Sequence, residues 1–180
     1  MKLELMNKDD FYKIVDWNKD KSGDFLLQWA GPSYTYPITI VQIEDHYFNE
    51  VQRKDSNAFI YKIIGDGDEV IGTIELRETD KVNKVGRVCR FLIGEEKVRG
   101  KGIGAKALNE VLRIGFEEMG FKKITLGVFD FNIRAIKCYE KVGFKKEKFM
   151  ENSRKASNGY WNLYDMGISK EEWELRYEKS

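Results

Sequence analysis

The stretch Val98-Arg99-Gly100-Lys101-Gly102-Ile103-Gly104-Ala105 follows an apolar, strand-like run over 85–94 and leads into a helical pattern over 106–119. The first turn of a helix leaves backbone N–H groups unpaired, and the helix dipole adds partial positive charge at that end. Glycines at alternate positions let the backbone approach a phosphate, because no Cβ intervenes. Arg99 and Lys101 add formal positive charge. We therefore interpret this strand, turn and helix as a cradle for a pyrophosphate.

Two other phosphate-binding patterns fit this stretch less well. A P-loop needs Gly, four further residues and then Gly-Lys-Ser/Thr, which the stretch does not supply. Gly102, Gly104 and Ala107 match the dinucleotide pattern G-x-G-x-x-A. That pattern expects an acidic residue about 20 positions later, where the run 122–125 reads Lys-Lys-Ile-Thr. The remaining alternative is a tight strand-to-helix turn that holds no ligand.

A second block downstream completes a resemblance to a known family. Arg99-x-x-Gly102-x-Gly104 resembles the R/Q-x-x-G-x-G/A acetyl-CoA motif of the GNAT superfamily of N-acetyltransferases. The block that resembles the superfamily's other signature reads Asn132-x-x-Ala135-x-x-x-Tyr139-Glu140-Lys141-x-Gly143-Phe144. The blocks stand in the family's order with one strand between them. The resemblance is strong over 85–150 and fainter over the rest of the chain.

The resemblance implies one α/β (α+β) domain over 1–180. Its central sheet would be mixed and mostly antiparallel, with about seven strands, splayed between two parallel strands and flanked by helices. The parallel strands would be 85–94 and 124–129, with the pantetheine arm of acetyl-CoA between them, paired to backbone amides as an added strand would be. The acetyl-CoA contacts implied in this way are Leu92, Ile93, Gly94, Arg99, Gly100, Lys101, Gly102, Ile103, Gly104, Ala105 and Asn132.

The family's chemistry is direct attack of a neutral primary amine on acetyl-CoA in a ternary complex. Tyr139 matches the tyrosine acid that protonates the departing thiolate, and a phenol with a pKa of about 10 stays protonated at neutral pH. From the residues alone, Tyr139 could equally be a packing side chain of its helix. The general base stays unassigned: Glu75 could act through water, or could be an ordinary solvated strand carboxylate.

The resemblance therefore implies an acetyl-CoA-dependent N-acetyltransferase that uses no metal. The acceptor is open between a protein N-terminus, a small amine and an aminoglycoside. Trp29, a Gly-Pro loop and the late Glu172-Trp173 are similar to the branch that contains ribosomal-protein N-terminal acetyltransferases. A non-catalytic acetyl-CoA sensor is the alternative, and a longer acyl group is a further possibility. Trp29, Tyr34 and Tyr36 would form either a part of the core or a wall of the acceptor site.

Composition excludes several other classes of protein. The 180 residues carry 31 basic and 30 acidic side chains, which argues against a duplex nucleic-acid binder. Two cysteines are too few for a disulfide framework or a thiolate metal site. No apolar run reaches the ~18 residues of a membrane span, and the start of the chain is too polar for a signal peptide, so we expect a cytoplasmic protein. Family members often pair through their C-terminal strands, which makes a homodimer an expectation.

His46, the only histidine, lies in a charged stretch and is expected to be a solvated surface residue. Hydrophobic periodicity and turn signals predict the remaining elements. Strands are expected over 2–6, 58–64, 70–77, 85–94, 124–129, 145–150 and 160–168, with a polar loop over 151–159. Helices are expected over 7–16, 25–30, 39–51, 106–119, 133–142 and 169–177.

Overall fold

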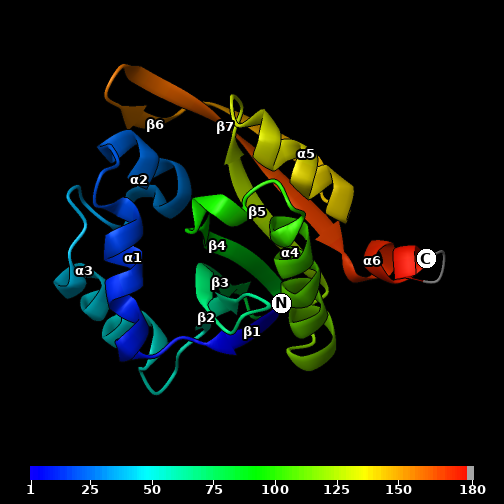
Figure 1. Ribbon diagram of the computed structural model, residues 1–180. Helices are drawn as coiled ribbons and strands as arrows, with labels where there is room; N and C mark the ends of the chain where they lie inside the picture. Colours follow the sequence, from blue (N-terminus) through cyan, green and yellow to red (C-terminus); the bar gives the residue numbers. More distant parts are fainter. Residues whose placement is uncertain (178–180) are drawn as a thin grey trace. The chain divides into compact units, whose positions relative to one another are not determined.

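The computed structural model describes residues 1–177, which form a seven-stranded mixed sheet and its helices (Figure 1). The strands are β1 Lys2–Leu5, β2 Ala58–Ile64, β3 Val70–Asp80, β4 Val85–Ile93, β5 Lys123–Phe129, β6 Lys145–Ala156 and β7 Gly159–Ser169. The helices are α1 Phe11–Asn18, α2 Gly23–Ala30, α3 Ile40–His46, α4 Ile103–Arg113, α5 Ile133–Val142 and α6 Lys170–Tyr177. The 3₁₀ turns are η1 Lys8–Asp10, η2 Gly31–Ser33 and η4 Glu96–Val98, and the π turns are η3 Tyr47–Val51 and η5 Ile114–Glu118.

The order of the strands in the sheet is β1-β2-β3-β4-β5-β7-β6. β4 and β5 run parallel, and their register joins Val85 to Lys123 and Val88 to Leu126. The pairings β1–β2, β2–β3, β5–β7 and β6–β7 are antiparallel. The predicted fold class, a mostly antiparallel sheet of about seven strands with one parallel pair, is confirmed.

The chain divides into two compact units, which we describe separately. The first comprises Met1–Arg77 and Cys89–Ile103, and the second comprises Glu78–Val88 and Gly104–Ser180. Because β3 and β4 each contain residues of both units, the boundary falls within strands rather than in linkers. The single domain over 1–180 stays a prediction.

The core of the first unit joins α1, α2 and α3 to strands β2 and β4. Ser22 and Thr39 begin α2 and α3 as N-caps, because their hydroxyl oxygens accept the N–H groups of Phe25 and Gln42. Apolar faces of these helices then meet in one buried cluster. Its members are Met6, Phe11, Ile14, Trp17, Leu26, Ala30, Tyr34, Ile38, Ile43, Tyr47, Ile60 and Leu92.

The aromatic residues of the α2–α3 region divide between core and surface. Tyr34 is buried in the cluster, and Trp29 packs against it with its ring 6.2 Å from that of Tyr34. The Trp29 Nε1–H donates to Asn18 Oδ1 at 3.0 Å. Tyr36 is 57% exposed. Tyr34 is therefore part of the core, Trp29 packs against the core but is only half-buried, and Tyr36 is exposed.

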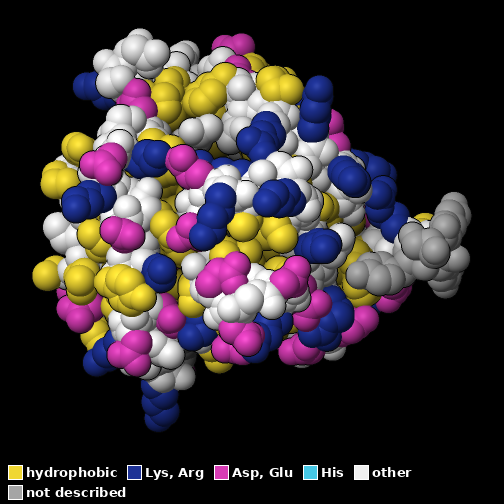
Figure 2. All heavy atoms as spheres, in the orientation of Figure 1, with side chains coloured by type: hydrophobic (Ala, Val, Ile, Leu, Met, Phe, Trp, Pro, Cys, Tyr) yellow, Lys and Arg dark blue, Asp and Glu magenta, His cyan; other side chains and the backbone are white. Residues whose placement is uncertain are grey.

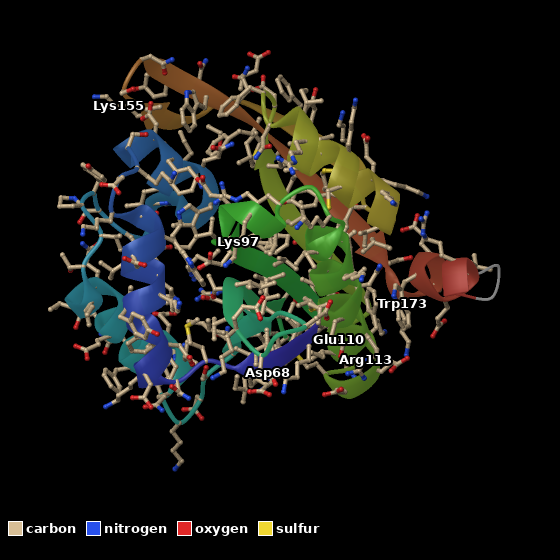
Figure 3. The ribbon with its side chains drawn as sticks, in the orientation of Figure 1. Asp68, Lys97, Glu110, Arg113, Lys155 and Trp173 are labelled. Carbon is tan, nitrogen blue, oxygen red and sulfur yellow. The ribbon has the colours of Figure 1, made fainter. Side chains whose placement is uncertain are left out.

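The second unit is organised around α4, the strongest helical pattern of the chain. Ala107, Leu108, Val111 and Leu112 form its buried stripe. The helix continues as the π turn η5, whose Phe116 ring lies 5.3 Å from that of Trp173 in α6. On the solvent side Arg113 pairs with Glu110 at 2.7 Å; Figure 3 labels both, together with Trp173. None of the helices within residues 1–177 combines the length and apolar character needed to cross a membrane.

Strand β6 is longer than the sequence predicts. The expected polar loop over 151–159 is largely a strand, paired with β7 from Lys145↔Gly167 to Ala156↔Gly159. Nearly all of β6 is exposed, so it needs no alternation of apolar and polar residues, and its composition resembles a loop. Cross-strand contacts, such as the Phe149 and Tyr164 rings 4.9 Å apart, hold it instead.

Surface charge follows the near-zero balance of the sequence. On the face drawn in Figure 2, Lys and Arg side chains stand among Asp and Glu side chains. Several are ion pairs, such as Lys123 with Glu147 at 2.7 Å and Lys145 with Glu172 at 2.6 Å.

Candidate functional site

The turn between β4 and α4 has the geometry of the predicted cradle. Gly100 and Gly102 have φ angles of 81° and 78°, in the left-handed region where glycine is favoured. A Cβ built on Gly102 would meet nothing within 4 Å, so the backbone conformation, rather than lack of space, is what requires glycine there. α4 begins at Ile103, so the N–H groups of its first turn have no partner within the helix. These donors, beside the exposed Lys101, are suited to a phosphate.

Arg99 does not turn toward that cradle. Its Nε donates to the carbonyl oxygen of Ile93 at 2.9 Å, and its Nη2 donates to that of Gly94 at 3.2 Å. A third bond joins Nη1 to Glu96 Oε1 at 3.2 Å. The guanidinium thus closes the turn that leads from β4 to the cradle. We expected the Arg99 charge to lie beside the N–H groups of the cradle. In the structure the guanidinium is instead bonded to the two carbonyl groups at the end of β4.

The end of β4 offers fewer free backbone groups than the sequence suggested. The Gly94 N–H donates to the Ile71 carbonyl at 2.9 Å, and the carbonyls of Ile93 and Gly94 are occupied by Arg99. The Glu95 N–H donates to the same Ile71 carbonyl, at 3.1 Å. Of the predicted contacts Leu92, Ile93 and Gly94, the last therefore has both its N–H and its carbonyl occupied within the fold.

Trp17 of α1 explains why residue 94 is glycine. A Cβ built there would lie 1.9 Å from the indole ring, which no real side chain tolerates. The indole Nε1–H donates to Glu95 Oε1 at 3.2 Å, and Lys21 pairs with Glu96 at 2.7 Å. The segment between α1 and α2 is therefore fastened to the turn that enters the cradle.

The second motif forms helix α5. Asn132 is its N-cap: the side-chain oxygen accepts the Ala135 N–H at 3.2 Å. Gly143, with a φ of 120°, ends the helix. Tyr139 lies on its half-buried side, with its ring 6.3 Å from that of Phe144. Burial raises the pKa of Tyr139 above its ordinary value, so the phenol keeps its proton at neutral pH.

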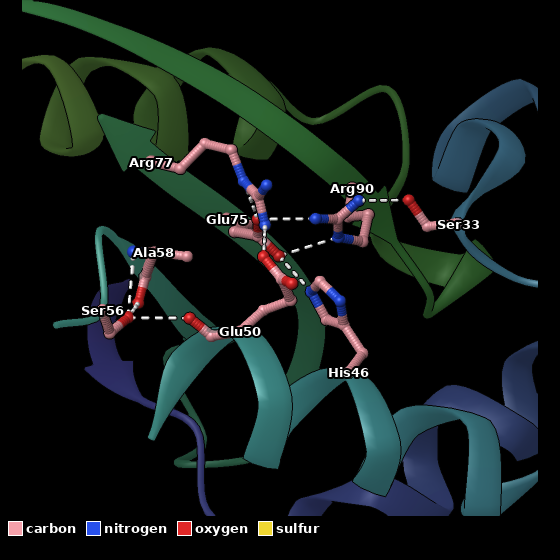
Figure 4. Close-up of polar contacts among 8 residues, drawn as sticks. All are labelled: Ser33, His46, Glu50, Ser56, Ala58, Glu75, Arg77 and Arg90. Atoms are coloured by element: carbon pink, nitrogen blue, oxygen red, sulfur yellow. Dashed lines mark hydrogen bonds and ion pairs between the residues drawn. The ribbon is translucent and has the colours of Figure 1, made fainter. Parts of the chain in front are cut away.

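A buried charge cluster in the first unit centres on Glu75 of β3 (Figure 4). The Glu75 carboxylate has no exposed surface and accepts hydrogen bonds from three side chains. Arg90 makes two, from Nε to Oε2 and from Nη2 to Oε1, both at 2.7 Å. Arg77 Nε donates to Oε1 at 2.8 Å, and His46 Nε2 lies 2.8 Å from Oε2. Arg90 also reaches Ser33 Oγ at 2.6 Å, which ties η2 to the sheet.

Charge and burial act in opposite directions on Glu75. Burial alone would raise the pKa of this carboxyl group. Hydrogen bonds from His46 and Arg90, with the charge of Arg90, outweigh burial and lower the pKa to about 2. A carboxylate that binds a proton so weakly, with its oxygens already occupied, is a poor general base at neutral pH. The structure thus argues against the role considered for Glu75.

His46 is not the solvated surface residue that the sequence predicts. Its side chain is 10% exposed and bonded to Glu75, and the Tyr34 ring stands edge-on to it at 5.7 Å. The prediction was based on the charged neighbours Glu44 and Asp45 and did not take into account the side of the helix on which His46 falls. His46 falls three residues after the buried Ile43, on the same side of α3.

Comparisons with known proteins agree with both motifs. The model of the acetyltransferase (GNAT) family matches residues 23–144. The SPbeta prophage-derived N-acetyltransferase YokL of Bacillus subtilis is 30% identical over 131 residues, which cover 73% of this chain and 72% of YokL. The spermidine N(1)-acetyltransferase of Escherichia coli is 25% identical over 169 residues, covering 93% of this chain and 85% of that protein.

The fold has a close counterpart among solved structures. The spermidine N-acetyltransferase of Vibrio cholerae, solved in complex with CoA and spermine, superposes with a TM-score of 0.82. The superposition covers 96% of each chain at 19% sequence identity. At that identity the likeness concerns the fold alone.

Proposed function

This chain belongs to the GNAT family of acetyltransferases, and we propose that its acceptor is a primary amine of a small polyamine-like cation. The enzyme transfers an acetyl group from acetyl-CoA to an amine nitrogen. The observation that carries the choice of acceptor is the likeness to a spermidine acetyltransferase along 93% of the chain. Nothing in the comparisons supports the alternative of a non-catalytic sensor.

The proposed donor site is built from the turn after β4. The pyrophosphate of acetyl-CoA rests on the N–H groups of Ile103, Gly104 and Ala105, with Lys101 as the nearby cation. The left-handed conformations of Gly100 and Gly102 support this, because they expose those donors. A pantetheine amide pairs with the backbone N–H of Ile93 at the end of β4, as an added strand would. Gly94 and Arg99 then hold the strand end in shape rather than contacting the donor.

Tyr139 is the proposed acid. As the amine nitrogen bonds to the carbonyl carbon, it loses one proton, which passes to solvent. The C–S bond breaks, the phenol gives its proton to the sulfur, and solvent later restores the proton of the phenol. The raised pKa of Tyr139 supports this role, because the proton is present across the neutral range. Asn132 acts through the helix that carries Tyr139, as its N-cap.

The test is acetyl transfer to a panel of amines, followed by mass spectrometry of the products. Spermidine should gain one acetyl group, while a peptide with a free N-terminus and an aminoglycoside react more slowly. A peptide that outperforms spermidine would assign the enzyme to N-terminal acetylation. Transfer to none of the three would contradict the proposed acceptor class. The predicted homodimer and cytoplasmic location stay predictions, and light scattering after gel filtration would test the first.

A further inference from the structure

The chain's single histidine is held in one orientation by a buried carboxylate. His46 is the last residue of α3, and its Nε2 lies 2.8 Å from Glu75 Oε2. Tyr34 borders the ring on another side. A 10% exposed imidazole between an aromatic ring and an ion pair has little freedom to rotate.

This contact also fixes which ring nitrogen carries the proton. Glu75 stays ionised through the neutral range and can only accept hydrogen bonds. The proton therefore resides on Nε2, and the lone pair of the neutral ring resides on Nδ1. No residue in the described part of the chain donates a hydrogen bond to that Nδ1.

The same carboxylate links the imidazole to strand β4. Arg90 Nε and His46 Nε2 both bond to Glu75 Oε2, at 2.7 and 2.8 Å, so the two side chains meet at one atom (Figure 4). Arg90 precedes Ile93 by three residues, and Ile93 is the residue assigned above to the acetyl donor. Arg90 is also a non-glycine residue with a positive φ, 44°, which its bonds to Glu75 help to hold.

We propose that His46 Nδ1 is the general base of the acetyl transfer and that Glu75 is its positioning residue. This inference rests on the proposed function. When the amine nitrogen bonds to the thioester carbon, one N–H proton passes to Nδ1, and the imidazolium is stabilised by the Glu75 carboxylate. The C–S bond breaks, the departing sulfur takes up a proton, and the imidazolium then returns its own proton to solvent. The electron pair of the broken C–S bond leaves with the sulfur.

The charges around His46 suit this role. Glu75 and Arg77 face it from β3, Arg90 faces it from β4, and the Tyr34 ring stands beside it. Glu50 of η3 pairs with Arg77 at 3.6 Å. The Glu75 carboxylate, bonded to Nε2, is the counter-charge for a proton that arrives at Nδ1.

The test is the His46→Gln variant, which keeps a donor for Glu75 but has no titrating nitrogen. The matched control is Lys62→Gln, because Lys62 makes a similarly buried ion pair with Asp10 in the same unit, at 3.0 Å, apart from Glu75. With acetyl-CoA and spermidine at pH 7.5, His46→Gln should lower kcat by about 100-fold or more, without changing KM for acetyl-CoA. Lys62→Gln should keep the wild-type kcat.

Two measurements distinguish a catalytic role of His46 from a purely structural one. The deficit of His46→Gln should shrink as the pH approaches about 10, where the amine loses its proton without help. Nitrogen NMR of the wild-type protein, which has one histidine signal pair, should show Nε2 protonated and Nδ1 bare at pH 8. A proton on Nδ1, or a deficit that does not vary with pH, would overturn the inference.

Failure of the proposal can be distinguished from failure of the proposed function. If the wild type acetylates spermidine and His46→Gln does so equally fast, the base assignment alone is wrong. If the wild type acetylates no amine of the panel, the proposed acceptor class and the base assignment fall together.

Discussion

Replacing Glu75 by Gln should destabilise the protein strongly, because it removes the negative charge at the centre of a buried cluster. Glutamine keeps the size of the side chain but leaves Arg90 without its counter-charge and Arg77 with only the longer pair to Glu50, at 3.6 Å. Removing one partner of a buried ion pair costs about 3–5 kcal/mol. The pKa of Glu75 gives a compatible figure: a fall from 4.5 to about 2 corresponds to about 3 kcal/mol.

The sign of the pH dependence follows from the lowered pKa. The carboxylate stabilises the folded state fully above pH 4.5, and its contribution disappears as the pH falls through about 2. About two thirds of it should be lost by pH 3. Urea unfolding of wild type and Glu75→Gln should therefore differ by about 3 kcal/mol at pH 7 and by much less at pH 3.

The matched control is Glu147→Gln, which breaks the half-exposed pair with Lys123 and should cost at most about 1 kcal/mol. If Glu75→Gln were as stable as this control at pH 7, the buried cluster would not hold the unit together. A difference that stayed constant between pH 7 and pH 3 would show that the charge of Glu75 is not its source.

Three further predictions concern the cradle and the acid. Gly94→Ala should lower the melting temperature, because its Cβ would collide with Trp17. The double variant Gly94→Ala/Trp17→Ala should lose less stability than the sum of the losses in the two single variants. Additive losses would contradict the contact. Gly104→Val should abolish acetyl-CoA binding in calorimetry while circular dichroism stays native, and retained affinity would refute the cradle. Tyr139→Phe should reduce kcat with little change in KM for acetyl-CoA, and an unchanged kcat at every pH would transfer the acid role to water.

Much of the fold can be predicted because local signals and tertiary contacts agree. Helix α5 has the predicted bounds, since Asn132 caps its start and Gly143 stops it with a positive φ. Strand β2 also has its predicted bounds, set by β-branched residues and the Gly-Asp turn that follows. Strand β6 was misjudged because an edge strand exposed on both faces resembles a loop in composition.

The candidate site could be predicted where function depends on backbone conformation. The glycines of the cradle are visible in the sequence, because left-handed φ angles demand them. The positions of Arg99 and Glu75 could not be predicted, since their partners lie elsewhere in the fold. Glu75 and Thr73 lie on the same face of their strand, and the sequence therefore predicts a polar, solvent-facing side. In the structure both residues are buried. Two arginines, from β3 and β4, and a hydrogen bond from His46 of α3 make that burial tolerable.

The central claim is that this chain transfers an acetyl group from acetyl-CoA through the turn between β4 and α4. The most direct test is the release of free CoA thiol by purified wild-type protein and by Gly104→Val, with spermidine as acceptor. Wild-type protein should release thiol only when both substrates are present, and the variant should release no thiol above background. Equal release by the two proteins would contradict the cradle assignment, and no release by the wild type would contradict the proposed reaction with a polyamine.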